Sequence, residues 1–195
     1  RSMAEHEQKE ETEELCQRFD SIEFLVLEQH GKNYGGVIDS ADPSSVLSIW
    51  DVNEVLHDRP AAKGKVGVYA RGPDGWEVIL GITPTTAVRV VQIDCSRSQN
   101  GPERDARVYV EARGSEEEPW TTIFPLQDLL SLVPPGKEFD PDRRNPHKAA
   151  LTLLCTESVN ASQIRLGFVL NARSNNCGIH GVRLFGEDNL TKAAR

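Results

Sequence analysis

A polar segment near the carboxyl-terminal end of the chain has the residue types of a binding loop. Residues 174–180 read SNNCGIH and lie between two strand-like runs. Asn175 and Asn176 offer amide donors and acceptors, His180 can donate or accept a hydrogen bond, and Gly178 lets the backbone of a partner approach closely. Asn and Gly also occur in plain hairpin connections, where they serve backbone geometry alone. The segment therefore predicts either the rim of a binding site or an ordinary turn.

The motifs of the common catalytic and metal sites are absent from the sequence. It has no G-x-S-x-G nucleophile turn, no phosphate-binding loop, no CxxC pair and no two histidines in i, i+4 spacing. Four aspartates, Asp39, Asp42, Asp51 and Asp58, could supply paired carboxylates. Their turn-like surroundings favour capping of the backbone over calcium coordination or catalysis. We expect a protein that is not an enzyme and that holds no metal and no cofactor.

Charge and composition argue against several classes of partner. The net charge is −8, and residues 1–14 alone hold six glutamates against one arginine and one lysine. Nucleic acid is not an expected partner, because its recognition needs a clustered basic face. No apolar run approaches the roughly 20 residues of a membrane span, and the start of the sequence lacks the apolar core of a signal peptide. The four widely spaced cysteines read as reduced thiols, so we expect a cytoplasmic or nuclear protein that is not bound to a membrane.

Short runs of alternating polarity predict strands. Residues 106–112, 148–155 and 163–170 each place apolar side chains at every second position, which is the pattern of a strand with one buried face. Clusters of Gly, Pro, Asn and Asp separate most of these runs, and no long amphipathic helix lies between them. The sequence therefore predicts an all-β fold, an antiparallel jelly-roll β-sandwich.

The same reading divides the chain into three regions. Residues 1–19 form an acidic tail or a short N-terminal helix, residues 20–188 form the sandwich, and residues 189–195 form a C-terminal tail. Within the sandwich, the apolar residues of segment 126–133 have helical spacing, and two prolines follow them. That segment predicts a short helix or turn.

Two segments resemble a known family. Residues 37–51, VIDSADPSSVLSIWD, resemble the strand and aspartate-rich turn that lead to a tryptophan in discoidin-like, galactose-binding-type sandwiches. Residues 164–185, IRLGFVLNARSNNCGIHGVRLF, resemble the last hairpin of the Doc-type domain, in which a strand leads into a polar loop and then into a final strand. That domain is known from the substrate-recognition subunit of the anaphase-promoting complex and from several large multidomain ubiquitin ligases.

The resemblance implies a non-catalytic module that recognises a protein or a short peptide. Its parent would be an intracellular multidomain protein such as an E3 ubiquitin ligase, and its ligand would bind to loops at one end of the sandwich. In this sequence Asn176 stands where the family often has an aspartate, and His180 stands where it often has an arginine. The implied binding residues are Trp50, Asp51, Asn53, Asn175, Asn176, Gly178 and His180. This site requires the two segments to meet at one pole of the sandwich.

A carbohydrate-binding module of the same fold and a purely structural domain are the two alternatives. A sugar site would need aromatic platforms at the rim of the loops. Aromatic residues make up only 6% of the chain, and Trp50, Trp76 and Trp120 read as residues of the core or its edge rather than as platforms. The fold by itself does not choose among these functions, because function lies in the site that the fold carries.

Overall fold

The structure, a computed structural model, describes residues 14, 16–30, 49–57, 68–70, 75–97, 107–132, 149–169 and 177–188. It confirms the predicted all-β class, with a short helical turn at residues 16–18. Within the described ranges, the structure contains no helix with the length and apolar character that a membrane span needs. The elements are β1 (Asp20–Ile22), β2 (Phe24–His30), α2 (Ile49–Leu56), β3 (Val68–Ala70), β4 (Trp76–Arg97), β5 (Arg107–Arg113), β6 (Thr121–Asp128), η2 (Leu129–Leu132), β7 (Ala149–Leu154), β8 (Asn160–Val169) and β9 (Cys177–Asp188).

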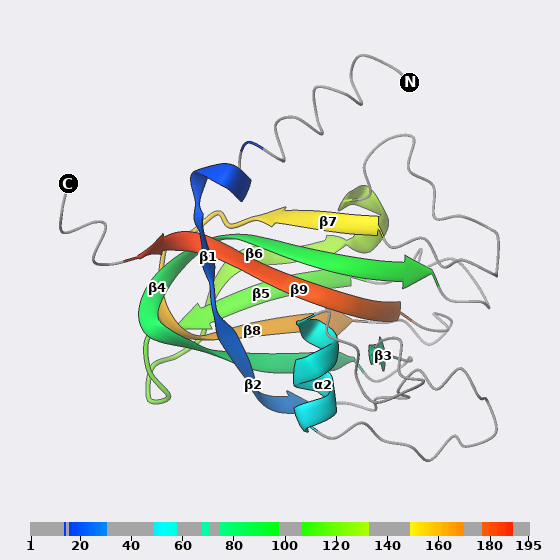
Figure 1. Cartoon of the computed structure of the whole chain (residues 1–195), viewed down its shortest axis with the longest axis horizontal. Coiled ribbons are helices and arrows are strands. Elements are labelled where there is room, and N and C mark those ends of the chain that lie inside the picture. Colours follow the sequence, from blue (N-terminus) through cyan, green and yellow to red (C-terminus); the bar gives the residue numbers. More distant parts are fainter. Residues whose placement is uncertain are drawn as a thin grey trace.

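One long strand, β4, belongs to both layers of the sandwich (Figure 1). The sequence predicts separate strands at 76–82 and 87–95, but the structure joins them into one strand of 22 residues that curves at one end of the molecule. Pro84, which follows a cis peptide bond, lies at the curve. It has no N–H for a ladder, and the hydroxyl of Thr86 donates a hydrogen bond of 2.8 Å to its carbonyl oxygen. The chain therefore leaves one ladder and enters the next without ending the strand.

The two halves of β4 pair with different strands, always antiparallel. The first half pairs with β2 and β8, and β5 and β6 extend that layer beyond β8. The second half pairs with β7 and β9, while β1 and β3 pair with β9. The expectation of a closing hairpin at 164–185 is therefore wrong in one respect, because β8 and β9 each pair with β4 and not with each other. Residues 170–176, which connect them, lie outside the described residues.

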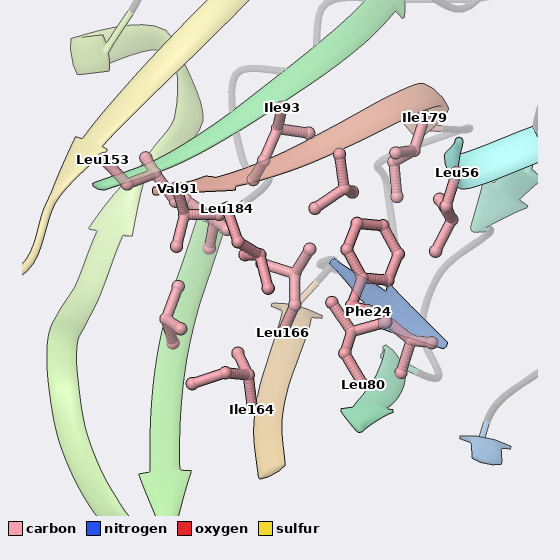
Figure 2. Packing of buried hydrophobic residues seen from close by; sticks show 14 of the residues in the cluster. Phe24, Leu56, Leu80, Val91, Ile93, Leu153, Ile164, Leu166, Ile179 and Leu184 are labelled. Atoms are coloured by element: carbon pink, nitrogen blue, oxygen red, sulfur yellow. The ribbon is translucent and has the colours of Figure 1, made fainter. Parts of the chain in front are cut away.

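The core lies between the layers and follows the predicted alternation. Ile164, Leu166 and Phe168 are buried on one side of β8. Phe168 packs on Trp76, the first residue of β4, with ring centroids 6.1 Å apart. Figure 2 shows side chains from β2, α2, β4, β7, β8 and β9 filling this space. The period-2 pattern of the strands thus identified a real buried face.

Helical structure after β6 is shorter than predicted. Strand β6 continues through Leu126 to Asp128, and only Leu129–Leu132 form a turn of 3-10 helix, η2. Pairing with β5 accounts for the extension, because Arg107 and Val108 of β5 face Asp128 and Gln127 of β6. Long-range pairing therefore overrides the helical spacing of the leucines at this point.

The strand register brings one end of each of β2, β4, β8 and β5 to the same end of the sandwich. His30 of β2 faces Glu77 of β4, Trp76 faces Phe168 of β8, and Val169 faces Arg107 of β5. Figure 1 shows helix α2 and strand β3 at this same end of the sandwich, opposite the curve of β4. We call it the α2 pole. Any site made by α2 and the start of β9 lies there.

Candidate functional site

Helix α2 carries three of the predicted binding residues and covers one side of the sandwich at the α2 pole. Its side chains Val52, Val55 and Leu56 are buried in the core, and the helix contacts both β2 and β9. Figure 2 places Leu56 at the same end of the core as Phe24 of β2 and Ile179 of β9. Two parts of the chain that the sequence predicts to meet, the segment around Trp50 and the start of β9, are thus neighbours.

The predicted bend before Trp50 is replaced by a helix in its described part. Val52, Val55 and Leu56 have the i, i+3, i+4 spacing of an apolar helical stripe. Asp51 lies in the first turn, where the partial positive charge of a helix N-terminus stabilises a carboxylate. The short helix forms because this apolar stripe packs against the core. Residues 37–48, with Asp39 and Asp42, lie outside the described residues.

Polar contacts join α2 to the edge of β2. The side-chain oxygen Oδ1 of Asn53 accepts a hydrogen bond of 3.1 Å from the backbone N–H of Val26. The ring of His57 stacks on Phe24, with centroids 4.2 Å apart, and its Nδ1 lies 2.7 Å from the carbonyl oxygen of Asn53. Asn53, predicted as a ligand contact, therefore has a structural role that the sequence did not reveal, since its oxygen protects the exposed edge of a strand.

Replacing Asn53 with alanine is expected to lower the free energy of unfolding by about 1–2 kcal/mol, because the N–H of Val26 would lose its acceptor in a part-buried position. Urea denaturation followed by circular dichroism measures the change. Hydrogen exchange at the Val26 amide should accelerate at the same time. Asn53→Asp is the matched control, since it keeps an oxygen at the same place and should cost clearly less. Equal stabilities of wild type and Asn53→Ala would contradict this role.

Two large apolar side chains at the start of α2 are exposed. Trp50 is 63% exposed and Ile49 is 43% exposed, although both begin a helix whose other side is buried. We call these two residues the α2 patch. Adjacent large apolar side chains that are exposed are a common sign of an interaction site, and tryptophan is the residue that most often dominates binding energy there.

The predicted residues near β9 divide into two groups. Asn175 and Asn176 lie outside the described residues. Gly178 and His180 were expected in a loop, but they lie within β9. Gly178 pairs with Tyr69 of β3 on one side and with Ser96 of β4 on the other. The binding role of these four residues stays a prediction.

His180 occupies an irregular position in β9. Gly181 faces Asp94, and Ile179 faces Cys95, so His180 is the extra residue of a β-bulge. A bulge leaves its extra residue out of the ladder and is often found beside functional sites, because it redirects a side chain. This predicted site residue therefore lies in a strand and not in a loop.

A second cluster, which the sequence analysis did not single out, lies on the outward side of the first layer. The ring of Tyr109 on β5 lies across Gly167 of β8, since a β-carbon on that glycine would come within 2.2 Å of the ring. Its hydroxyl donates a hydrogen bond of 3.1 Å to Glu77 of β4, the strand on the other side of β8. Burial, with the charge and the hydrogen bond of Glu77, raises the pKa of Tyr109 to about 12. The phenol is therefore a hydrogen-bond donor at neutral pH.

Two arginines extend this cluster toward the β5–β6 connection. Arg165 donates a hydrogen bond of 2.7 Å to Glu111, and its Nε lies 3.8 Å from Glu77. The guanidinium carbons of Arg165 and Arg113 lie 4.5 and 4.2 Å from the ring centroid of Trp120. Such cation–π contacts stabilise both the arginines and the indole. We call Glu77, Tyr109, Glu111, Arg113, Trp120 and Arg165 the Tyr109 face.

The three tryptophans have different surroundings. Trp76 is 1% exposed, as expected of a core residue. Trp120 is half-buried under guanidinium groups, so its ring is largely occupied. Trp50 is exposed, contrary to expectation, and is the tryptophan best placed to contact a ligand.

Nothing in the described part of the chain suits metal or thiol chemistry. No group of three His, Cys, Asp or Glu side chains there could hold a metal ion. Cys16, Cys95 and Cys155 are free thiols. Burial raises the pKa of Cys155 to about 12, so its thiolate is scarce at neutral pH and the thiol is a poor nucleophile. Cys95 is fully buried in the core.

Comparison with known proteins identifies the fold. No protein-family model matches the chain, and no curated protein matches it in sequence. Among solved structures, allantoicase from Saccharomyces cerevisiae has a TM-score of 0.52 at 15% identity over 95% of this chain. The match covers 54% of the allantoicase chain, so this chain spans about half the length of that enzyme. This likeness supports the predicted β-sandwich at the level of fold.

Two further structures are more distant. XRCC1, solved in a reduced form bound to the catalytic domain of DNA polymerase β, has a TM-score of 0.49 at 12% identity, with 87% of this chain and 100% of that chain covered. A CBM32 module from a family 31 glycoside hydrolase of Clostridium perfringens has a TM-score of 0.46 at 13% identity, with 89% and 98% covered.

Proposed function

We propose that the chain is a non-catalytic recognition module that binds a protein partner through the α2 patch. The observation that carries this proposal is the exposure of Trp50 and Ile49 on a helix whose other side is fixed in the core. Because Val52, Val55 and Leu56 anchor the helix, the patch is held in place before a partner arrives, which lowers the entropy lost on binding. Helix α2 contacts β9, and the start of β9, with Gly178 and His180, is the second contact in this proposal.

A protein surface fits the α2 patch better than a sugar does. An aliphatic side chain beside an indole makes an apolar area that a partner's own apolar residues can cover, and the centres of protein interfaces are rich in such residues. The proposed setting is an intracellular multidomain protein of the ubiquitin-ligase type. The resemblance of residues 37–51 and 164–185 to Doc-type domains supports that setting.

A carbohydrate-binding module is the second candidate function. The exposed ring of Trp50 favours it, because a sugar could stack on such a ring at the α2 pole. The CBM32 neighbour makes a sugar panel a natural arm of the experiment.

Replacing Trp50 with alanine is expected to weaken partner binding by about tenfold or more, since exposed tryptophans of interfaces are the usual energetic centres. Peptides are first selected from a phage-displayed random library against the wild-type chain. They are then titrated into ¹⁵N-labelled protein while the indole N–H of Trp50 and the amide of Gly178 are followed by NMR. A panel of oligosaccharides is titrated in the same way.

The matched control is Leu154→Ala, which removes an apolar side chain of similar exposure, 49%, from β7. Both variants should keep the wild-type melting temperature within a few degrees, because neither side chain is buried. Saturable shifts from peptides alone support the protein reading, and shifts from sugars alone support the second candidate. Peptide dissociation constants that Trp50→Ala leaves unchanged would remove the α2 patch from the site.

A further inference from the structure

We propose that the Tyr109 face is a second binding surface and that its ligand is a neutral oligosaccharide. This surface is separate from the α2 patch, because it lies on the outward side of β4, β8 and β5, while α2 packs on β2 and β9. It therefore goes beyond the protein-binding function proposed for the helix. Three features of the face carry the inference: the position of its aromatic ring, the balance of its charges and the fixed geometry of its acceptors.

The aromatic ring is the first feature. Tyr109, Gly167 and Glu77 face one another across three adjacent strands, and the tyrosine reaches from the first to the third. Its ring must therefore lie along the sheet instead of standing away from it, and the missing side chain of Gly167 makes this possible. A ring that lies along a surface can stack against the C–H groups of a pyranose, which is the usual way aromatic side chains hold sugars.

The charge balance is the second feature. Arg165 is placed between Glu77 and Glu111, and Arg113 donates its Nε–H to Gln163 over 2.8 Å. An anionic or cationic ligand would have to compete with these existing pairs before it could form its own. A neutral ligand can form hydrogen bonds with these groups without breaking their existing pairs. The charge pattern thus favours a neutral, polar ligand over a charged one.

Unused acceptor capacity is the third feature. The contacts of Tyr109 and Arg165 with Glu77 use its Oε2, and the contact of Arg165 with Glu111 also uses Oε2. The Oε1 atoms of both carboxylates can accept hydrogen bonds from sugar hydroxyls. These side chains are 19–29% exposed, so a ligand can reach them while their neighbours hold their rotamers. Such preorganisation reduces the entropic cost of binding.

The test is an NMR titration of the whole ¹⁵N-labelled chain with defined probes, the neutral hexaoses of glucose, xylose, mannose and galactose. We expect at least one probe to give saturable shifts at the side-chain Nε–H of Arg165 and at the indole N–H of Trp120. We expect no shift at the indole of Trp50. Hexagalacturonate, an acidic probe of the same length, should bind at least about tenfold more weakly than the best neutral probe.

Variants then separate binding from structure. Tyr109→Ala should raise the dissociation constant of that neutral hexaose by about tenfold or more, while Trp50→Ala should leave it unchanged. Tyr109→Phe keeps the ring over Gly167 and should retain most of the affinity, and it serves where Tyr109→Ala does not fold. The proposal would be overturned if none of the four neutral probes shifted the side-chain signals of Arg165 and Trp120. Shifts there from peptides alone would overturn it too, and neither result would affect the α2 patch.

Discussion

Replacing Trp76 with alanine should be among the most damaging single changes to this protein, lowering the free energy of unfolding by about 3–5 kcal/mol. Trp76 is one of the largest fully buried side chains, and it packs on Phe168 at the α2 pole. Its removal leaves a cavity between β4 and β8 that the paired strands cannot close, because their backbones are held in register. Urea denaturation followed by circular dichroism measures the loss without depending on tryptophan fluorescence.

The matched control for this position is Trp76→Phe. Within the described part of the chain, the indole Nε1 of Trp76 has no hydrogen-bond acceptor. Phenylalanine therefore gives up volume but no hydrogen bond, and we expect a cost of about 1–2 kcal/mol, less than half that of alanine. A cost for Trp76→Phe equal to that for Trp76→Ala would show that the N–H, and not the packed volume, stabilises the site.

Replacing Gly186 with alanine is expected to cost about 3 kcal/mol, although the change adds only one methyl group. Gly186 lies in β9 between β1 and β4, and a β-carbon there would come within 2.0 Å of the backbone carbonyl oxygen of Ala87. The oxygen belongs to a buried part of β4 next to its curve, so the clash can be relieved only by moving one strand away from another. The lost pairing is the source of the cost.

Gly81→Ala provides the comparison within the same sheet. The three atoms nearest to a β-carbon at Gly81 would all belong to the side chain of Leu27, which is 42% exposed and can turn away. Alanine also reduces the conformational freedom of the unfolded chain, so this change should lie within about 1 kcal/mol of wild type. Melting temperatures from calorimetry should rank wild type and Gly81→Ala together and Gly186→Ala well below. A mild Gly186→Ala would mean that β1 and β4 are less tightly joined to β9 than their register indicates.

The two proposed surfaces suit different kinds of ligand. The α2 patch is apolar, exposed and carried by a helix that the core holds from behind. The Tyr109 face is polar, half-buried and held by hydrogen bonds between three strands. A ligand that gains from burying apolar area would choose the first surface, and one that gains from many directed hydrogen bonds would choose the second.

Strands and core were predictable because they depend on local pattern. Alternation at 106–112, 148–155 and 163–170 needs only a pleated backbone with one side in water. Strand β7 lies within the second of these segments, and β5 and β8 overlap the first and the third. The pairing of the strands was not predictable in the same way. A single continuous β4 and the separation of β8 from β9 depend on contacts between residues far apart in sequence, which no local pattern records.

The sequence alone determined that this chain is an all-β sandwich, which residues of its strands face inward, and that Trp76 belongs to the core. It also singled out Trp50 and His180, although it expected a bend and a loop where the structure has a helix and a bulge. Only the tertiary structure decided that Asn53 protects the edge of β2 and that Tyr109 reaches across Gly167 to Glu77. Such contacts join residues 27 and 32 positions apart, and they exist only after strand register has brought those residues together.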